Sequence, residues 1–141
     1  YIGSLLASLG DFSPTVLVAL LTGMMSLLTE FTSNAATTEM MLPIIAALSV
    51  EIKVNPLLLM LPVTLAASMA FMFPIATPPN AIVFGTGKLK VFQMISTGFL
   101  INIFAIIIIT LFTMTWGTII LDIDPTVFPD WANHTNTTVK H

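Results

Sequence analysis

An uncharged run of 24 residues, from residue 98 to residue 121, limits the folds that this chain can adopt. A helix rises about 1.5 Å per residue, so the run would extend over roughly 36 Å. That length is enough to cross the ~30 Å hydrocarbon core of a bilayer with some tilt. Trp116 lies near the end of the run, where an interfacial aromatic belt is expected. The run predicts a continuous transmembrane helix, the final one of the chain, over 98–121.

The composition excludes several other classes of protein. The chain is 56% hydrophobic and 8% charged, whereas soluble domains contain about 25% charged residues. It has no cysteine, which excludes disulfides and thiolate metal sites. The net charge of −3 gives no footprint for nucleic acid. The two histidines, His134 and His141, lie in a polar tail, so we predict an integral membrane protein that is not an enzyme and has no cofactor.

A second uncharged stretch, residues 56–84, is interrupted by the sequence TPPN at residues 77–80. Proline has no N–H, so the two prolines leave the preceding turn without its helical donors. We predict a helix over 57–75, an unwound loop, and a second half-helix over 80–86. Irregular backbone is tolerated at membrane depth only where protein or a wet cavity satisfies its polar groups. Residues 56–95 are therefore expected to hold a broken transmembrane helix and a loop.

The polar stretch EFTSNAATTEMMLP, residues 30–43, separates two short apolar runs. The run over residues 14–29 is marginal in length for a spanning helix, and the run over residues 40–50 is too short. Pro14 is suited to the first position of a helix, where its missing N–H costs little. We therefore predict a re-entrant helical hairpin over 14–50 that returns to the side from which it entered.

The polar tip of this hairpin offers ligands for both a cation and an anion. A helix that ends inside a membrane exposes carbonyl groups at its C-terminus and N–H groups at its N-terminus. Neutral side-chain oxygens at the tip suit Na⁺, and they belong to Thr29, Thr32, Ser33 and Asn34. Asn34 also has an NH₂ group that can bind a carboxylate. Discontinuous helices of this kind form the sites of many secondary transporters, although Ser and Thr also bond backbone carbonyls for purely structural reasons.

Two acidic residues flank the tip. We expect Glu39 in the first turn of the second hairpin helix, where the helix dipole favours a negative charge. Glu30 is expected in the last turn of the first hairpin helix, where the dipole opposes it, so a cation or several hydrogen bonds must compensate. A structural role is the preferred interpretation for both residues. For Glu30 that role is hydrogen-bonded, and a direct ligand role is its alternative.

The two ends of the last helix predict its orientation. The tail over 122–141 contains N-x-T sequons at Asn133 and Asn136, although such triplets also arise by chance. Their glycosylation would make the tail extracellular, and Lys88 and Lys90 would then face the cytoplasm, as the positive-inside rule favours. The chain begins without methionine, so we expect a fragment of a plasma-membrane protein in which residues 1–13 end a preceding scaffold or interfacial segment.

Three segments carry a resemblance to a known family. They are TEFTSNAATTEMMLPI, LPVTLAASMAFMFPIATPPNAIVFGTGKLK and the closing FPDWAN. In order and spacing they resemble the divalent anion/sodium symporters, and most of all the animal sodium-coupled citrate and dicarboxylate transporters. The resemblance covers about residues 14–133. It implies an all-α integral membrane fold in which this chain is the C-terminal portion and most of the second inverted repeat of an elevator-type transporter.

The resemblance also implies which residues bind the ligands and what the protein does. The residues implied for Na⁺ are Thr29, Thr32, Ser33, Asn34, Ala76 and Pro78. The residues implied for the substrate are Ser33, Asn34, Ala35, Thr77 and Pro78. The implied function is sodium-coupled transport of di- or tricarboxylates by a homodimer that assembles through the scaffold domain.

One position departs from the family pattern. The third residue of the tip motif is often threonine in the family and is Ala35 here, which removes a hydroxyl donor and enlarges the pocket. Citrate, C4 dicarboxylates and sulfate therefore all stay open as substrates. A sodium-independent dicarboxylate exchanger and a sulfate/sodium symporter are the alternative functions.

Overall fold

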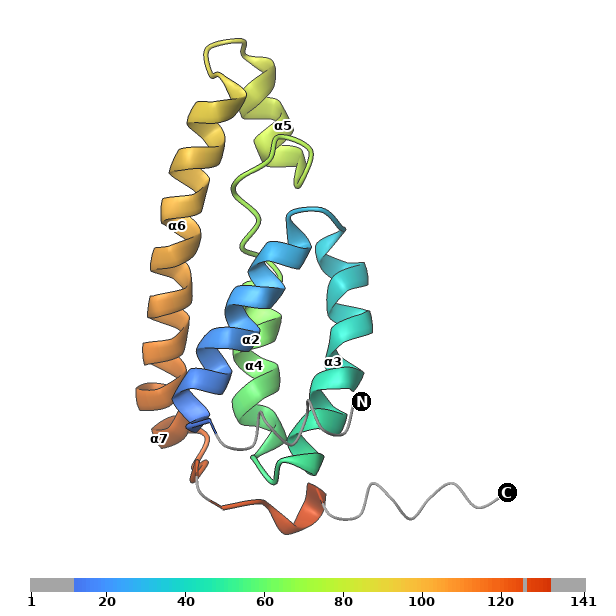
Figure 1. Ribbon diagram of the computed structural model, residues 1–141, viewed down its shortest axis with the longest axis vertical. Coiled ribbons are helices and arrows are strands. Elements are labelled where there is room, and N and C mark those ends of the chain that lie inside the picture. The colour runs from blue at the N-terminus through green and yellow to red at the C-terminus, as the bar shows by residue number, and fades with distance from the viewer. Residues whose placement is uncertain (1–11, 126, 133–141) are drawn as a thin grey trace, which may run out of the picture.

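A computed structural model describes residues 12–125 and 127–132, and every regular element in these ranges is helical. The helices are α2 (Pro14–Thr29), α3 (Asn34–Glu51), α4 (Pro56–Ala66), α5 (Pro78–Gly85), α6 (Val91–Phe112) and α7 (Thr118–Ile120), with a π-helix over Thr113–Gly117 between the last two. Figure 1 shows α2, α3 and α4 grouped together, with α6 running along the molecule beside them. The predicted all-α fold is confirmed.

Helices α2 and α3 form a helical hairpin. Helix α2 begins at Pro14, as expected, and α3 begins at Asn34, six residues before the apolar run at residue 40. Ser33 is the N-cap of α3, because its Oγ accepts a hydrogen bond of 3.2 Å from the N–H of Ala36. We call residues 30–33 the tip. Because α3 starts at Asn34, Glu39 lies in its second turn, and the expectation of a first-turn position was wrong.

The interruption in the second apolar stretch is longer than predicted. Helix α4 ends at Ala66 rather than at residue 75, and residues 67–77, which we call the break, are irregular. The two prolines lie in the first turn of α5, where a missing N–H leaves no acceptor unpaired. The helix ends early because side chains replace its own hydrogen bonds: Thr29 and Ser26 of α2 donate to the carbonyls of Ala67 and Met69.

The last helix begins at Val91, not at residue 98. Gln93 stabilises this earlier start, because its Oε1 accepts a hydrogen bond of 3.0 Å from the N–H of Lys90. The helical segment Val91–Ile120 has 30 residues and a mean hydropathy of 2.4 over its most apolar window. Within the described part of the chain it is the one helix that is long and apolar enough to cross a membrane.

The core lies where α4 packs against α2 and α3, and α6 packs on α2 beside it. Its central side chains are completely enclosed, as Val18, Leu59 and Val63 show with no exposed surface. The opposite side of α6 presents apolar side chains to the outside: Phe104 is 62% exposed and Ile108 is 63% exposed. A helix with an apolar outer face requires a lipid or protein environment, which agrees with an integral membrane protein.

Candidate functional site at the hairpin tip and helix break

The tip and the break line a common cavity of about 220 Å³. Its lining residues are Glu30, Phe31, Thr32, Ser33, Ile75 and Ala76. The rings of Phe31 and Phe73 also meet across this junction, with their centroids 5.3 Å apart. Figure 1 shows the irregular chain between α4 and α5 passing beside the turn between α2 and α3. The structure therefore brings together three of the predicted ligand residues, Thr32, Ser33 and Ala76.

Next to this cavity, oxygen atoms from three helix ends converge. The Oγ1 of Thr29 lies 2.6 Å from the Oδ1 of Asn34 and 2.7 Å from the carbonyl oxygen of Ala67. A hydroxyl has one proton and can donate to only one of these acceptors. The cluster therefore holds more acceptor oxygens than donated protons, and oxygen ligands are the ones that hard cations prefer. Its chemistry fits a small cation such as Na⁺.

Thr32 and Ser33 also take part in local hydrogen bonds. The Thr32 hydroxyl donates to the carbonyl of Leu28 at 2.9 Å and lies in contact with the Thr37 hydroxyl. The carbonyl of Ser33 accepts from the N–H and the hydroxyl of Thr37. These contacts stabilise the end of α2 and the start of α3. The two side chains thus have a structural role in addition to their place in the cavity wall.

The other predicted substrate ligands lie in adjoining helix ends and do not line the cavity. Ala35 is the second residue of α3 and is exposed. Thr77 is the N-cap of α5, and Pro78 is its first residue. Their assignment as substrate ligands, and that of Pro78 as a sodium ligand, stays a prediction.

Glu30 is completely buried beside the tip. Its carboxylate accepts hydrogen bonds from the N–H groups of Phe71 (2.8 Å), Met72 (3.0 Å) and Phe73 (3.2 Å). The amide Nδ2 of Asn102 adds a fourth donor at 2.9 Å. Hydrogen bonds to an ionised group are stronger than neutral ones and offset the opposing dipole of α2. The expected structural, hydrogen-bonded role of Glu30 is confirmed.

Three groups near the site were not identified from the sequence. Asn80 donates to the carbonyls of Ala70 and Phe73 at 2.8 and 3.1 Å, and Asn102 donates to Glu30. The third is the carbonyl of Ala67. A signal for Asn102 was present, because it is the one amide in the apolar run over residues 98–121 and such side chains in membrane helices bond across helices. A backbone carbonyl gives no sequence signal.

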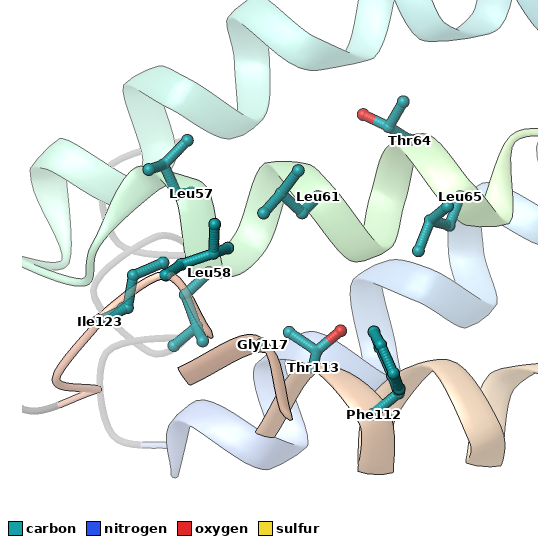
Figure 2. A pocket seen from close by; sticks show the side chains of 10 residues that line it. Leu57, Leu58, Leu61, Thr64, Leu65, Phe112, Thr113, Gly117 and Ile123 are labelled. Carbon is teal, nitrogen blue, oxygen red and sulfur yellow. The ribbon is translucent and has the colours of Figure 1, made fainter. Parts of the chain in front are cut away.

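A different cavity of about 220 Å³ lies between α4 and the end of the last helix (Figure 2). Leucines 57, 58, 61 and 65 form much of its wall, and Thr64 and Thr113 have the only polar side chains among its ten lining residues. The Thr64 hydroxyl is engaged, because it donates to the carbonyl of Met60 at 2.7 Å. Such a lining accepts an apolar group rather than a carboxylate or Na⁺, so this cavity is not the candidate site.

Two predictions concern residues that the structure does not describe. The sequons at Asn133 and Asn136 lie outside residues 12–125 and 127–132, as does most of the expected scaffold segment over 1–13. Glycosylation and the placement of that segment therefore stay predictions.

Comparison with known proteins identifies relatives over most of the chain. The rat Na(+)/citrate cotransporter is 47% identical over 131 residues, which cover 92% of this chain and 23% of the relative. The sodium-dependent dicarboxylate transporter of Staphylococcus saprophyticus is 47% identical over 126 residues, covering 89% of this chain and 24% of the relative. The rat Na(+)/dicarboxylate cotransporter 3 is 42% identical over 133 residues, which cover 94% of this chain and 22% of the relative.

The chain spans about a quarter of the length of these relatives. The family model described as "Sodium:sulfate symporter transmembrane region" matches residues 1–123. The resemblance that the tip and break motifs carry is thereby confirmed, and the chain belongs to the sodium:sulfate symporter family of transmembrane proteins.

Proposed function

We propose that this chain forms part of a longer carrier that performs sodium-coupled secondary active transport of di- or tricarboxylates. The observation that carries the proposal is the cavity shared by the tip and the break, with the oxygen cluster of Thr29, Asn34 and Ala67 beside it. The names of the relatives support the class of substrate, because they describe citrate and dicarboxylate transporters that use sodium.

In this proposal the two cargoes bind to different atoms of the helix ends that adjoin the tip. Na⁺ is held by the neutral oxygens at the C-terminus of α2 and the end of α4. The substrate carboxylate is held at the N-terminus of α3, where the first N–H groups have no intrahelical acceptor. Ser33 already satisfies the N–H of Ala36, so those of Asn34 and Ala35 are available to the carboxylate. A cation bound beside these N–H groups makes the electrostatic free energy of binding the anion more favourable.

Helix lengths support a re-entrant placement of the hairpin. Helix α2 has 16 residues and extends over about 24 Å, which is short of the ~30 Å hydrocarbon core. We infer that the tip lies within the membrane, that α4 and α5 form one discontinuous helix, and that the chain is part of the second of two inverted repeats. The same proposal includes an elevator movement, a homodimer through the scaffold, and a plasma-membrane location with an extracellular C-terminus.

Sulfate is the alternative cargo that a specific observation favours, because the matching family model is described as a sodium:sulfate symporter region. Sulfate and a carboxylate present similar acceptor oxygens to a helix N-terminus. Ala35 lacks the hydroxyl that could discriminate between them. The third possibility is exchange of dicarboxylates without sodium.

Uptake of labelled succinate, citrate and sulfate by cells that express the full-length protein distinguishes these functions. With Na⁺ outside, we expect saturable uptake of at least one carboxylate at about ten times the rate seen with choline. The reason is that none of the described residues that line the cavity is a lysine or arginine, so the anion depends on the bound cation. Equal rates in Na⁺ and choline would indicate an exchanger, and sulfate uptake alone would indicate a sulfate symporter. Liposomes that contain only residues 1–141 are expected to transport nothing and serve as the control.

A further inference from the structure

Gly98 of α6 lies directly against the backbone of the break. A Cβ atom at this position would clash with the carbonyl oxygen of Phe71 and would lie 2.7 Å from the Cα of Met72. Both are backbone atoms, which cannot rotate away as the end of a flexible side chain can. Glycine is therefore the residue that allows α6 to approach the break this closely.

The peptide segment that Gly98 contacts is fixed on its other sides. The N–H groups of residues 71–73 donate to Glu30, and the carbonyls of Ala70 and Phe73 accept from Asn80. A buried backbone group that loses its partner costs about 1–3 kcal/mol. The segment therefore cannot move aside for a larger residue at position 98 without breaking these hydrogen bonds.

Asn102 lies four residues after Gly98 and so faces the same side of α6. It is 4% exposed, and its Nδ2 donates to the same Oε1 of Glu30 that accepts from Phe71 and Met72. Its Oδ1 is buried and has no protein partner among the described residues. Through Gly98 and Asn102, α6 thus contacts both the peptide segment and the carboxylate that holds it.

The same segment continues directly into the cavity wall. Phe73 touches Phe31 of the tip, and Ile75 and Ala76 line the cavity together with Glu30. A displacement of residues 71–72 would therefore change the position of Ile75 and Ala76 relative to the tip. The last helix lies outside the cavity but can set its width.

We propose that Gly98 and Asn102 are positioning residues that fix the separation between the tip and the break, and thereby the affinity of the cavity for its cargo. The identity of that cargo rests on the proposed function, but the positioning itself rests on the contacts of Gly98, Asn102 and Glu30. Neither residue touches the cargo.

Gly98→Ala tests the close approach, with Gly23→Ala as its matched control. Gly23 lies in α2 and faces α6, but a Cβ there meets only the Cδ1 of Ile106, at an ordinary 3.6 Å. In the full-length protein we expect Gly98→Ala to raise the half-saturating Na⁺ concentration or the substrate KM about tenfold or more, since a misplacement near 1 Å can cost about a hundredfold. The maximal rate per surface-expressed molecule should change less than the KM, because the cargo contacts themselves are retained.

Asn102→Leu removes the hydrogen bond to Glu30 while keeping the branching and the number of side-chain heavy atoms. If both residues act through the same peptide segment, their effects on the KM should not multiply. The increase in KM of the double variant Gly98→Ala/Asn102→Leu should then be smaller than the product of the two single increases by more than about twofold. Effects that multiply independently, or a Gly98→Ala variant whose KM values equal those of Gly23→Ala, would overturn the proposal. A fall in surface expression without a change in KM would also count against it.

A second measurement separates this proposal from the proposed function. Na⁺ that binds the native state raises the Tm of the purified full-length protein. If none of the three anions is taken up but Na⁺ still raises the Tm, the proposed transport function is wrong. The positioning role is then tested by the Na⁺-dependent rise in Tm, which Gly98→Ala should reduce and Gly23→Ala should not. Absence of both uptake and the Na⁺-dependent rise in Tm would overturn both proposals.

Discussion

Glu30→Leu is expected to reduce the yield of correctly assembled full-length protein several-fold and to abolish uptake. The substitution leaves four donors without an acceptor in a buried environment, namely the N–H groups of residues 71–73 and the Nδ2 of Asn102. Each stranded donor costs about 1–3 kcal/mol, whereas proteins are stable by only about 5–15 kcal/mol. The thermal unfolding of the detergent-purified protein and its elution in size-exclusion chromatography measure the effect.

Glu39→Gln is the matched control for this prediction. Glu39 is exposed in the second turn of α3, so its substitution should leave both the yield and the Tm unchanged within error. Glu30→Gln is expected to lie between the two, because one oxygen remains but the new NH₂ group faces backbone N–H donors. A Glu30→Leu protein that assembled and transported like Glu39→Gln would contradict the assignment of Glu30 as the group that holds the break.

The sequence predicted features that local chemistry decides. Pro14 is tolerated at the start of a helix but not in its interior, and the cluster of polar side chains in residues 30–34 favours a helix end and a turn. The turn between α2 and α3 therefore followed from the sequence alone. The two prolines of the TPPN motif correctly indicated a discontinuity, although they mark the start of α5 rather than the end of α4.

Features that depend on contacts between distant segments were not predicted. Residues 67–75 are apolar except for Ser68 and contain no helix-breaking residue before Pro74, so the sequence favours continuing the helix. They unwind because Ser26, Thr29 and Glu30, some 40 residues earlier, provide other hydrogen-bond partners for this backbone. The start of the last helix at Val91 depends instead on a local contact. Gln93, the third residue of α6, caps the helix, and the uncharged run from residue 98 gives no sign of this cap.

Among substitutions that leave the fold intact, Asn34→Ala is expected to have the largest effect on transport. Asn34 places its Oδ1 2.6 Å from the Thr29 hydroxyl in the oxygen cluster. In the proposed site this Oδ1 binds Na⁺, and the side-chain NH₂ group adds a donor to the backbone N–H groups that hold the substrate carboxylate. Its loss should be tolerated structurally, because Thr29 can still donate to the carbonyl of Ala67 at 2.7 Å. Hydrogen bonds to charged groups contribute about 1.5–3 kcal/mol each, so loss of both contacts should lower uptake about a hundredfold or more.

Two companion variants make this result interpretable. Asn55→Ala removes another asparagine at a helix start, where Oδ1 caps the N–H of Leu57 and the residue does not line the cavity. This variant should lower the Tm but keep the uptake per surface-expressed molecule.

Asn34→Asp keeps the oxygen that faces the cation cluster but replaces the NH₂ donor with a negative charge. It should therefore retain the Na⁺-dependent rise in Tm and lose carboxylate uptake, because like charges repel the substrate. If Asn34→Ala transported at the unmodified rate with normal surface expression, the tip would not be the binding site.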